Sequence, residues 1–228
     1  MSGGEVVRQH WHDDHHLVHA STGVLSVSTD DGVWVAPSDR VLWVPATTVH
    51  AHRAYGSTTL LTVALPASTR SCPEATTVVA VDPLLRELLL AVGAAGEADG
   101  PADRRLRAVL LDRLRRAAPD RALHLPAVRD PRLRAAAAAL DADPAGSLDE
   151  VAARIGVSAR TLSRLCRSGL GATFPQWRTR LRLHRALVLL AEGLSVTTVA
   201  HRTGWASTSA FVDVFHRHLG YSPGRRPG

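Results

Sequence analysis

The sequence predicts an α+β chain made of an N-terminal antiparallel β-barrel and a C-terminal all-α domain with two helix-turn-helix units. Three observations predict it: β-branched runs broken by turn residues over 17–65, helical periodicity after residue 82, and a capped helical pattern that occurs twice in the last third. A chain of 228 residues is long enough for two small domains. We expect a barrel over 1–80, a helical pair over 81–118, a linker over 119–131 and the helix-turn-helix domain over 132–228.

The expected strands are LVHA, GVLSVST, VWVAP, VLWVP and TTLLTVALP, which are separated by Asp-Gly, Ser-Asp and Pro. Such spacing is typical of an antiparallel meander or barrel. Leucines then recur at helical spacing over 82–95 and 102–117, which predicts two amphipathic helices. We expect this pair to pack on the barrel or on its copy in a second chain. The segment 119–131 is rich in proline and has no clear period, so it is expected to be the linker.

The first helix-turn-helix unit begins at a capping box, in which Ser147 and Glu150 each bond the other's backbone amide. Gly156 suits the turn that ends this helix, and Ser158 caps the next one. In that second helix Leu162, Leu165 and Cys166 are expected to face the core. The opposite stripe consists of Arg160, Ser163, Arg164 and Arg167, as a DNA-recognition helix requires.

The pattern returns 48 residues later, where Ser195 matches Ser147 and Gly204 matches Gly156. The second turn is one residue longer, and Phe211, Val214 and Phe215 take the inward positions. A helix that opens at Thr173 and Pro175 and runs to Glu192 separates the two units. One rigid helix would thus hold two recognition helices at a spacing that suits successive visits to the major groove, about one DNA turn apart.

Charge is unevenly distributed along the chain. Residues 1–118 carry 11 Arg against 13 acidic residues, whereas residues 119–228 carry 16 Arg against 8. All 27 basic residues are arginine; a composition bias could explain the missing lysine, but not the uneven distribution. The basic C-terminal part favours a nucleic-acid partner.

The two cysteines, Cys72 and Cys166, lie far apart, which argues against a disulfide framework. The sequence contains no apolar run long enough to span a membrane and does not open with a secretory signal pattern. We therefore expect a cytoplasmic protein.

The stretches LDEVAARIGVSARTLSRLCRSGLGATFPQWR, RLHRALVLLAEG and SVTTVAHRTGWASTSAFVDVFHRHLGYSP resemble the AraC/XylS family of bacterial transcription regulators over about 125–223. The resemblance implies a regulator that binds double-stranded promoter DNA, and RNA polymerase if it activates. It places base contacts at Arg160, Ser163 and Arg164 in the first recognition helix, and at Ser209 and Asp213 in the second. Arg167 and His216 on the same helices complete the candidate DNA-binding residues.

Two features depart from the family pattern. Many relatives carry a basic or neutral residue where this chain has Asp213, and an acid there repels phosphate unless it accepts a hydrogen bond from a cytosine amino group. The second helix is therefore expected to read less sequence than the first. The chain ends in SPGRRPG, so Arg225 and Arg226 would be at best loose phosphate contacts.

Seven of the twelve histidines lie between His10 and His52. The even spacing of His10, His12 and His16 would put them on one face of a strand, and His50 could approach them across the barrel. The pattern resembles the metal site of cupins, with His16 at the position of the usual acid. These four imidazoles would suit Zn, Ni, Cu or Fe. A metal-free pocket for a small organic effector stays open, His15 and His19 are expected at the surface, and Trp11, Trp34 and Trp43 in the core or pocket wall.

The leading interpretation is a one-component transcription regulator, not an enzyme, whose barrel senses an effector or a metal and whose helical pair forms a homodimer. The alternative is a cupin-type metalloenzyme fused to a DNA-binding module. It is disfavoured because no acid occupies the cupin ligand position and no general acid-base pair stands out. A constitutive DNA binder whose barrel only dimerises is a third possibility.

Overall fold

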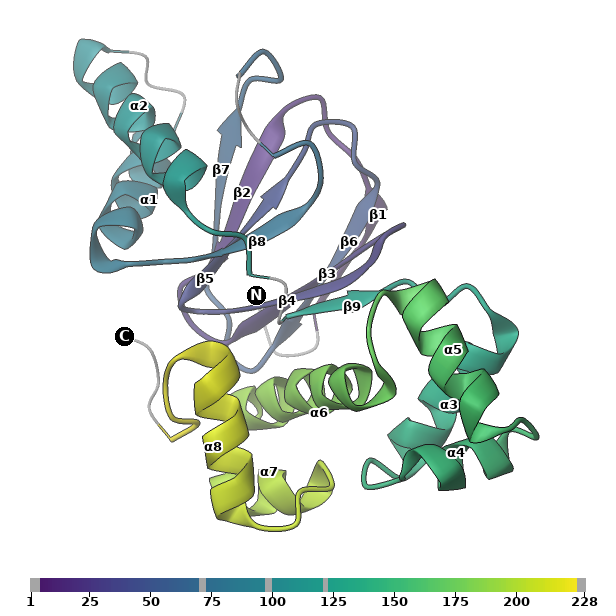
Figure 1. Cartoon of the computed structure of the whole chain (residues 1–228). Coiled ribbons are helices and arrows are strands. Elements are labelled where there is room, and N and C mark those ends of the chain that lie inside the picture. The colour runs from purple at the N-terminus through teal and green to yellow at the C-terminus, as the bar shows by residue number, and fades with distance from the viewer. Residues whose placement is uncertain (1–4, 70–72, 97–99, 121–122, 225–228) are drawn as a thin grey trace. The chain divides into compact units, whose positions relative to one another are not determined.

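The computed structural model describes residues 5–69, 73–96, 100–120 and 123–224, and shows β-strands followed by helices (Figure 1). The chain forms two compact units. The first comprises Met1–Thr29 and Trp34–Arg121, and the second Asp30–Val33 and Ala122–Arg226. Each unit is described by itself.

The first unit contains two antiparallel sheets. One has the order β1 (Val6–His10), β6 (His50–Tyr55), β3 (Val24–Thr29) and β4 (Gly32–Pro37), whose first two residues are grouped with the second unit. The other has the order β7 (Leu60–Leu65), β2 (His15–Ala20), β5 (Arg40–Val44) and β8 (Thr77–Ala80). Side chains from both sheets share one buried core, among them Val18, Leu25 and Leu42. The predicted barrel is therefore present as two facing sheets that are separate in their hydrogen bonding.

The sheet β7-β2-β5-β8 is covered on its other face as well. Two helices, α1 (Pro83–Ala95) and α2 (Pro101–Arg116), bury Leu85, Leu89 and Leu110 in a second core with Leu17 and Trp43. Asp82 caps α1 by accepting from the amide of Leu85 at 2.8 Å. Because both faces are buried, β5 is buried along its whole length and is apolar from Val41 to Val44 instead of alternating, and the helical pair packs on its own sheet.

The end of the first unit is fastened to β8. Pro119 bridges to Val79, and the amide of Asp120 donates to the carbonyl of Val78 at 2.7 Å. Arg40, which is buried, donates through Nε to the Asp120 carboxylate at 3.0 Å and also pairs with Asp39. The first residues of the expected linker thus belong to a folded edge.

The second unit starts with β9 (His124–Pro126), which lies beside residues 30–33: Ala127 donates its amide to Asp31 at 2.8 Å. Helices then follow without interruption by strands, as predicted. They are α3 (Pro131–Ala142), α4 (Leu148–Arg154), α5 (Ala159–Leu170), α6 (Phe174–Ala191), α7 (Val196–Arg202) and α8 (Thr208–Leu219). Among the described helices, none combines the length and apolar character that a membrane span needs.

Both predicted helix-turn-helix units are confirmed in their local chemistry. Ser147 and Glu150 form the capping box of α4, and Ser158 accepts from the amide of Thr161 at the start of α5. Ser195 and Ser207 cap α7 and α8 in the same way. The turn glycines both take positive φ, 70° at Gly156 and 75° at Gly204, where a side chain would be strained. Local sequence signals therefore set both units.

Candidate DNA-binding surface and histidine cluster

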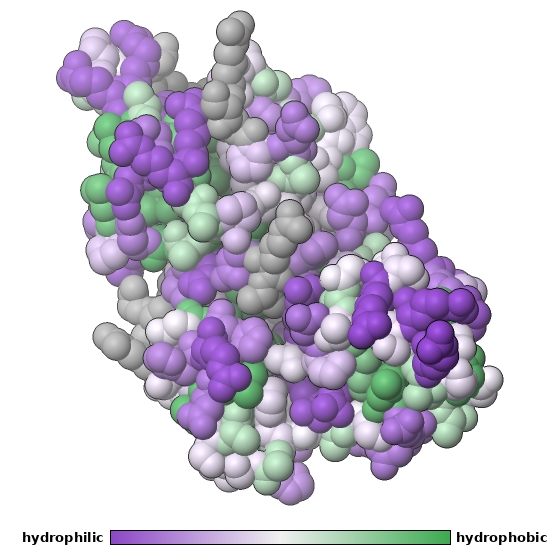
Figure 2. All heavy atoms as spheres, viewed as in Figure 1, coloured by the Kyte–Doolittle hydropathy of each residue, from purple (hydrophilic) through white to green (hydrophobic). Residues whose placement is uncertain are grey.

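The first candidate recognition helix, α5, separates its arginines from its core residues. Arg160, Arg164 and Arg167 are exposed and Ser163 is half-buried. The opposite face buries Leu162, Cys166 and Leu170. Figure 2 shows strongly hydrophilic side chains gathered where α5 lies in the second unit. This face offers planar guanidinium groups of the kind that bind guanine and phosphate.

The corresponding face of α8 has different chemistry. Ser209, Asp213 and His216 are exposed, while Phe211, Phe215 and Leu219 are buried. The hydroxyl groups of Ser209 and Ser207 lie 3.0 Å apart, so Ser209 also takes part in the helix cap. Arg225 and Arg226 lie outside the described residues. The face of α8 named by the sequence thus carries hydroxyl, carboxylate and imidazole groups instead of arginines.

The histidine cluster of the first unit forms where β1 ends beside the start of β6. His10 pairs in register with His50, and their ring centroids lie 4.4 Å apart. The ring of His12 lies 4.9 Å from that of His50 and 6.0 Å from that of His10. Ligand atoms of these three histidines all fall within 4.8 Å of one another.

The expected single strand from His10 to His16 is wrong. β1 ends at His10, His12 lies in the connection, and His16 belongs to β2. Strands β1 and β2 belong to different sheets, so the even spacing of His10, His12 and His16 does not bring their side chains together. The connection over residues 11–14 brings them together instead. The His16 ring stacks on that of His12 at 3.3 Å, and His16 stays outside the three-histidine group.

Hydrogen bonds fix the proton on each ring of the group. His10, His12 and His50 each donate from Nδ1 to a backbone carbonyl at 2.8 Å, those of Arg8, Asp14 and Thr48 respectively. A carbonyl oxygen only accepts, so the neutral ring keeps its proton on Nδ1 and leaves a lone pair on Nε2. The Nε2 atoms of His12 and His50 are buried without a hydrogen-bond partner. Carbonyl bonds of this kind orient the histidine ligands of metal sites.

Sequence reasoning missed His52. It follows His50 by two residues on β6, it is buried, and its ring lies 4.8 Å from that of His50. Its Nε2 is also buried without a partner. The even spacing of His50 and His52 was the available signal, because alternate residues of a strand share a face.

Burial favours the neutral form of His16, His50 and His52. Desolvation, with the neighbouring histidines adding to it, lowers the pKa of His52 to about 3. The same causes, opposed by Asp14, lower the pKa of His16 to about 4. Burial also lowers the pKa of His50, against the hydrogen bond to Thr48. These imidazoles are neutral at physiological pH, the form in which histidine ligates metals.

Two of the remaining expectations need correction. His19 is not at the surface: it is buried, and its Nδ1 bonds the carbonyl of Arg40 at 3.0 Å. Trp11 is 58% exposed rather than in the core, since it lies in the connection after β1, whereas Trp34 and Trp43 are buried as predicted. His15 is half-buried and accepts the amide proton of Ala46 at 2.9 Å.

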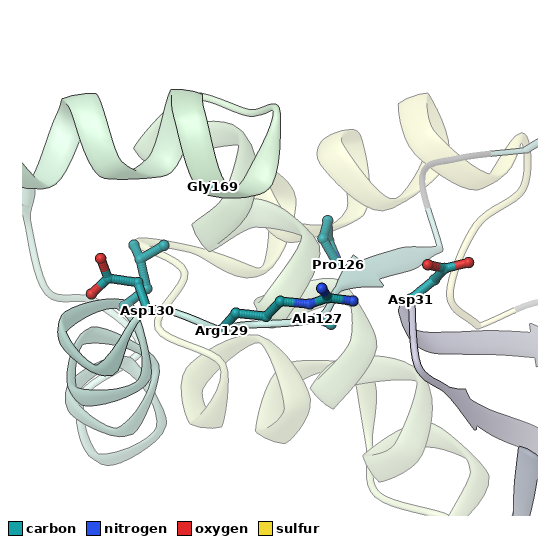
Figure 3. A pocket seen from close by; sticks show the side chains of 7 residues that line it. Asp31, Pro126, Ala127, Arg129, Asp130 and Gly169 are labelled. Carbon is teal, nitrogen blue, oxygen red and sulfur yellow. The ribbon is translucent and has the colours of Figure 1, made fainter.

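A shallow pocket of the second unit lies between the loop after β9 and α5 (Figure 3). Asp130 and Arg129 line it, but the Asp130 carboxylate points away from the Arg129 guanidinium and pairs with Arg132 at 2.8 Å. The Arg129 guanidinium instead extends toward the side of the pocket where Asp31 lies.

Both parts of the chain match known families. Residues 3–115 match the AraC-like ligand binding domain, and residues 151–225 match a helix-turn-helix domain. The HTH-type transcriptional regulator NimR of Escherichia coli is 31% identical over 220 residues, which cover 95% of this chain and 80% of NimR. RipA of Corynebacterium glutamicum, another HTH-type transcriptional regulator, is 43% identical over 101 residues, 43% of this chain and 30% of RipA.

Among solved structures, the DNA-binding domain of AdpA in complex with a target DNA is 36% identical; the alignment covers 41% of this chain and 86% of that one, with a TM-score of 0.38. The named relatives are transcription regulators and not enzymes. The match to NimR along almost the whole length, with a ligand-binding domain followed by a helix-turn-helix domain, shows that this chain belongs to the AraC family of DNA-binding transcription regulators.

Proposed function

We propose that this regulator responds to a divalent transition metal bound by His10, His12 and His50. The observation that carries the proposal is the hydrogen bonding of the three rings: each Nδ1 bonds a backbone carbonyl, and ligand atoms of all three rings converge within 4.8 Å. Two of the free Nε2 atoms are buried without a partner, an arrangement that costs free energy unless something binds them.

The donor set narrows the choice of metal. Neutral imidazoles suit Zn, Ni, Cu or Fe, and less so the hard ions that prefer oxygen ligands. Two further imidazoles lie beside the group: the buried His52, whose ring lies 4.8 Å from that of His50, and His16, which stacks on His12 at 3.3 Å. Three ligands leave a coordination position open, so a water molecule or a small anion can complete the shell.

The DNA contacts are proposed on the exposed faces of α5 and α8. Arg160 and Arg164 would each bind a guanine through two hydrogen bonds, Ser163 would contact a base edge, and Arg167 a phosphate. On α8, Ser209 and His216 would hydrogen-bond the DNA, and Asp213 would accept from a cytosine amino group. Exposure of these faces, with the core residues opposite, supports the assignment.

These sites suggest a separate function for each part of the chain. We propose sensing by residues 1–80, a linker over 119–131 and DNA binding by 132–228, in a cytoplasmic protein that contacts RNA polymerase if it activates transcription. The helical pair over 81–118 would form a homodimer. Leu84, Leu90 and Val109 are exposed there, and Figure 2 shows hydrophobic side chains on the surface where α1 lies.

The first test is the metal content of the purified, untagged protein, compared with His10→Ala/His12→Ala. His15→Gln is the matched control, because it removes a histidine of the same segment that lies outside the three-histidine group. We expect near-stoichiometric metal in the wild type and the control, and its loss in the double variant. Elemental analysis after growth with added Zn, Ni, Cu and Fe gives the result.

The second test is DNA binding with and without metal, on DNA selected from a random pool by the wild-type chain. Coupling between two sites typically changes affinity about 5- to 150-fold. Chelation should therefore shift the affinity of the wild type and the control, but not that of the double variant. Absence of metal from all three proteins would contradict the proposal and favour an organic effector. Metal binding with unchanged DNA affinity would favour a structural ion in a constitutive DNA binder.

A further inference from the structure

The loop that leads into the first helix-turn-helix unit touches the turn of the second unit directly, away from the helix that connects the two units. The contact lies between the α3–α4 loop, residues 143–147, and the turn between α7 and α8. A Cβ atom built on Gly204 would lie 2.6 Å from the amide nitrogen of Ala145 and 2.7 Å from the carbonyl carbon of Pro144. Only a residue without a side chain permits this approach of the two backbones.

An arginine of α6 closes the contact from the side. Arg182 donates from Nε to the carbonyl of Pro144 at 2.6 Å, and its guanidinium carbon lies 5.1 Å above the ring of Trp205. One side chain therefore binds both the α3–α4 loop and the α7–α8 turn. Burial, and the charge of Arg178, lower the pKa of Arg182 to about 10, so the guanidinium stays charged at neutral pH.

Two further arginines on the same face of α6 hold the loop in place. Arg178 donates to the carbonyl of Gly146 in the loop at 2.7 Å, and Arg185 donates at 2.8 Å to that of Asp141, in the last turn of α3 just before the loop. Positions 178, 182 and 185 follow helical spacing, so all three side chains leave α6 on one side. The loop is therefore a fixed support and not a free end.

The connecting helix by itself leaves one freedom. Figure 1 shows α6 running between the α3–α5 helices and the α7–α8 helices. A unit attached to one helix can still rotate about the axis of that helix. Such a rotation would shift α8 relative to the major groove of the bound DNA. A direct contact between the units removes this freedom.

We propose that Gly204, Trp205 and Arg182 form a joint that locks the two recognition helices at one spacing, so that the protein accepts only DNA with its two contacted segments at that separation. The three are positioning residues, which act through the placement of α8. The proposal rests on DNA binding by both units and does not depend on the metal.

The test uses DNA selected by the wild-type chain and footprinted to find the two protected segments. Affinity is measured on this DNA and on versions with one or two base pairs inserted between the segments. For the wild type we expect the insertions to lower affinity about tenfold or more, since the contacts of one unit are lost. Gly204→Ala should bind the selected DNA more weakly than the wild type does. Its affinities for the selected DNA and for the DNA with insertions should differ by no more than about twofold.

Gly156→Ala is the matched control. Gly156 occupies the same place in the first unit, with φ of 70° against 75° at Gly204, but its Cβ would meet no atom within 4 Å. Both variants carry the same backbone strain, and only Gly204→Ala forces the two units apart. Gly156→Ala should keep the full insertion penalty.

A second pair of variants guards against misfolding of Gly204→Ala. Arg182→Met removes the hydrogen bond to Pro144 and the contact with Trp205. Arg185→Met removes the hydrogen bond and the ion pair to Asp141, in the last turn of α3, and leaves the contact between the loop and the turn intact. With circular dichroism confirming the fold, Arg182→Met should lose the insertion penalty and Arg185→Met should keep it. A full penalty in both Gly204→Ala and Arg182→Met would overturn the joint, as would a wild type that tolerates the insertions. A single protected segment in the wild type would instead contradict binding by both units.

Discussion

The two helix-turn-helix units share their helix caps and turns, and differ in the residues of their second helices. Both begin at a serine cap and turn at a glycine of positive φ. The first unit presents three exposed arginines over a core containing Cys166, whereas the second presents Ser209, Asp213 and His216 over two phenylalanines. Duplication preserved what sets the fold of the units and let the contact surfaces diverge. We therefore expect the first unit to supply more of the binding energy and the second more of the stability.

The largest expected effect concerns the two cores. Phe215→Ala should lower the free energy of unfolding by about 3–5 kcal/mol, because a fully buried aromatic ring leaves a cavity. Cys166→Ala at the matching position of the first unit should cost about 1 kcal/mol, since only a sulfur atom is removed. Thermal or urea unfolding measures both, and equal losses would refute the asymmetry in stability.

The recognition faces are compared next. Arg164→Ala should weaken binding to the selected DNA by about 1–3 kcal/mol, because a guanine loses both hydrogen bonds. Ser209→Ala on α8 should cost less than about 1 kcal/mol, since a hydroxyl group makes at most one such bond. Fluorescence anisotropy at fixed salt gives both values. A larger loss of affinity for Ser209→Ala would show that the second unit, and not the first, contributes more to DNA binding.

The helix caps differ in a smaller way. Ser147 has a reciprocal partner in Glu150: the Glu150 amide donates to the Ser147 hydroxyl at 3.3 Å, and the Glu150 carboxylate accepts from the Ser147 amide at 2.8 Å. Ser195 accepts from the Thr198 amide at 3.2 Å, and its hydroxyl lies 2.8 Å from that of Thr198. Ser147→Ala and Ser195→Ala should each cost about 1 kcal/mol of stability, with the larger loss at Ser147.

The two caps should also respond differently to acid. Hydrogen bonds with Ser147 lower the pKa of Glu150, so the contribution of Glu150 is present at neutral pH and is lost as pH falls through its folded-state pKa. Unfolding at neutral and acid pH tests this, and an acid-independent difference between the two variants would contradict it.

The smallest expected effect is that of Asp213→Asn. Removing an acid from the face of α8 should raise affinity for random-sequence DNA by less than about 1 kcal/mol, because the carboxylate of Asp213 no longer repels the DNA phosphates. It should also relax any preference for cytosine in the selected sites. Binding to random DNA at two salt concentrations is the measurement, and weaker random binding would show that Asp213 does not face the phosphates.

What could be predicted from the sequence was local. The Ser147 cap, the turn at Gly156 and their repeat at Ser195 and Gly204 depend on residues within a few positions, and the structure confirms them. The histidine cluster was predicted only in part, because it depends on pairing between distant strands. Register places His10 opposite His50, and burial of β6 brings in His52, neither of which follows from spacing within residues 10–16.

His19 and Trp11 were misjudged for the same reason. His19 lies in β2, in the sheet that is covered on both faces, so a polar side chain is enclosed and bonds the carbonyl of Arg40. Trp11 lies in the connection after β1 and remains exposed despite its size. Burial at both positions is decided by the packing of sheets and helices, which the one-dimensional pattern does not contain.

The buried thiol of Cys166 makes the first helix-turn-helix unit a reporter of its own opening. Desolvation raises the pKa of this thiol to about 11, and α5 holds the sulfur in the core. A thiol reagent can modify it only while α5 is detached, so in a Cys72→Ser chain the labelling rate counts the openings of that unit over time. DNA that binds α5 should slow the labelling. The labelling rate of Cys166 would therefore measure how far the first recognition helix is engaged by DNA.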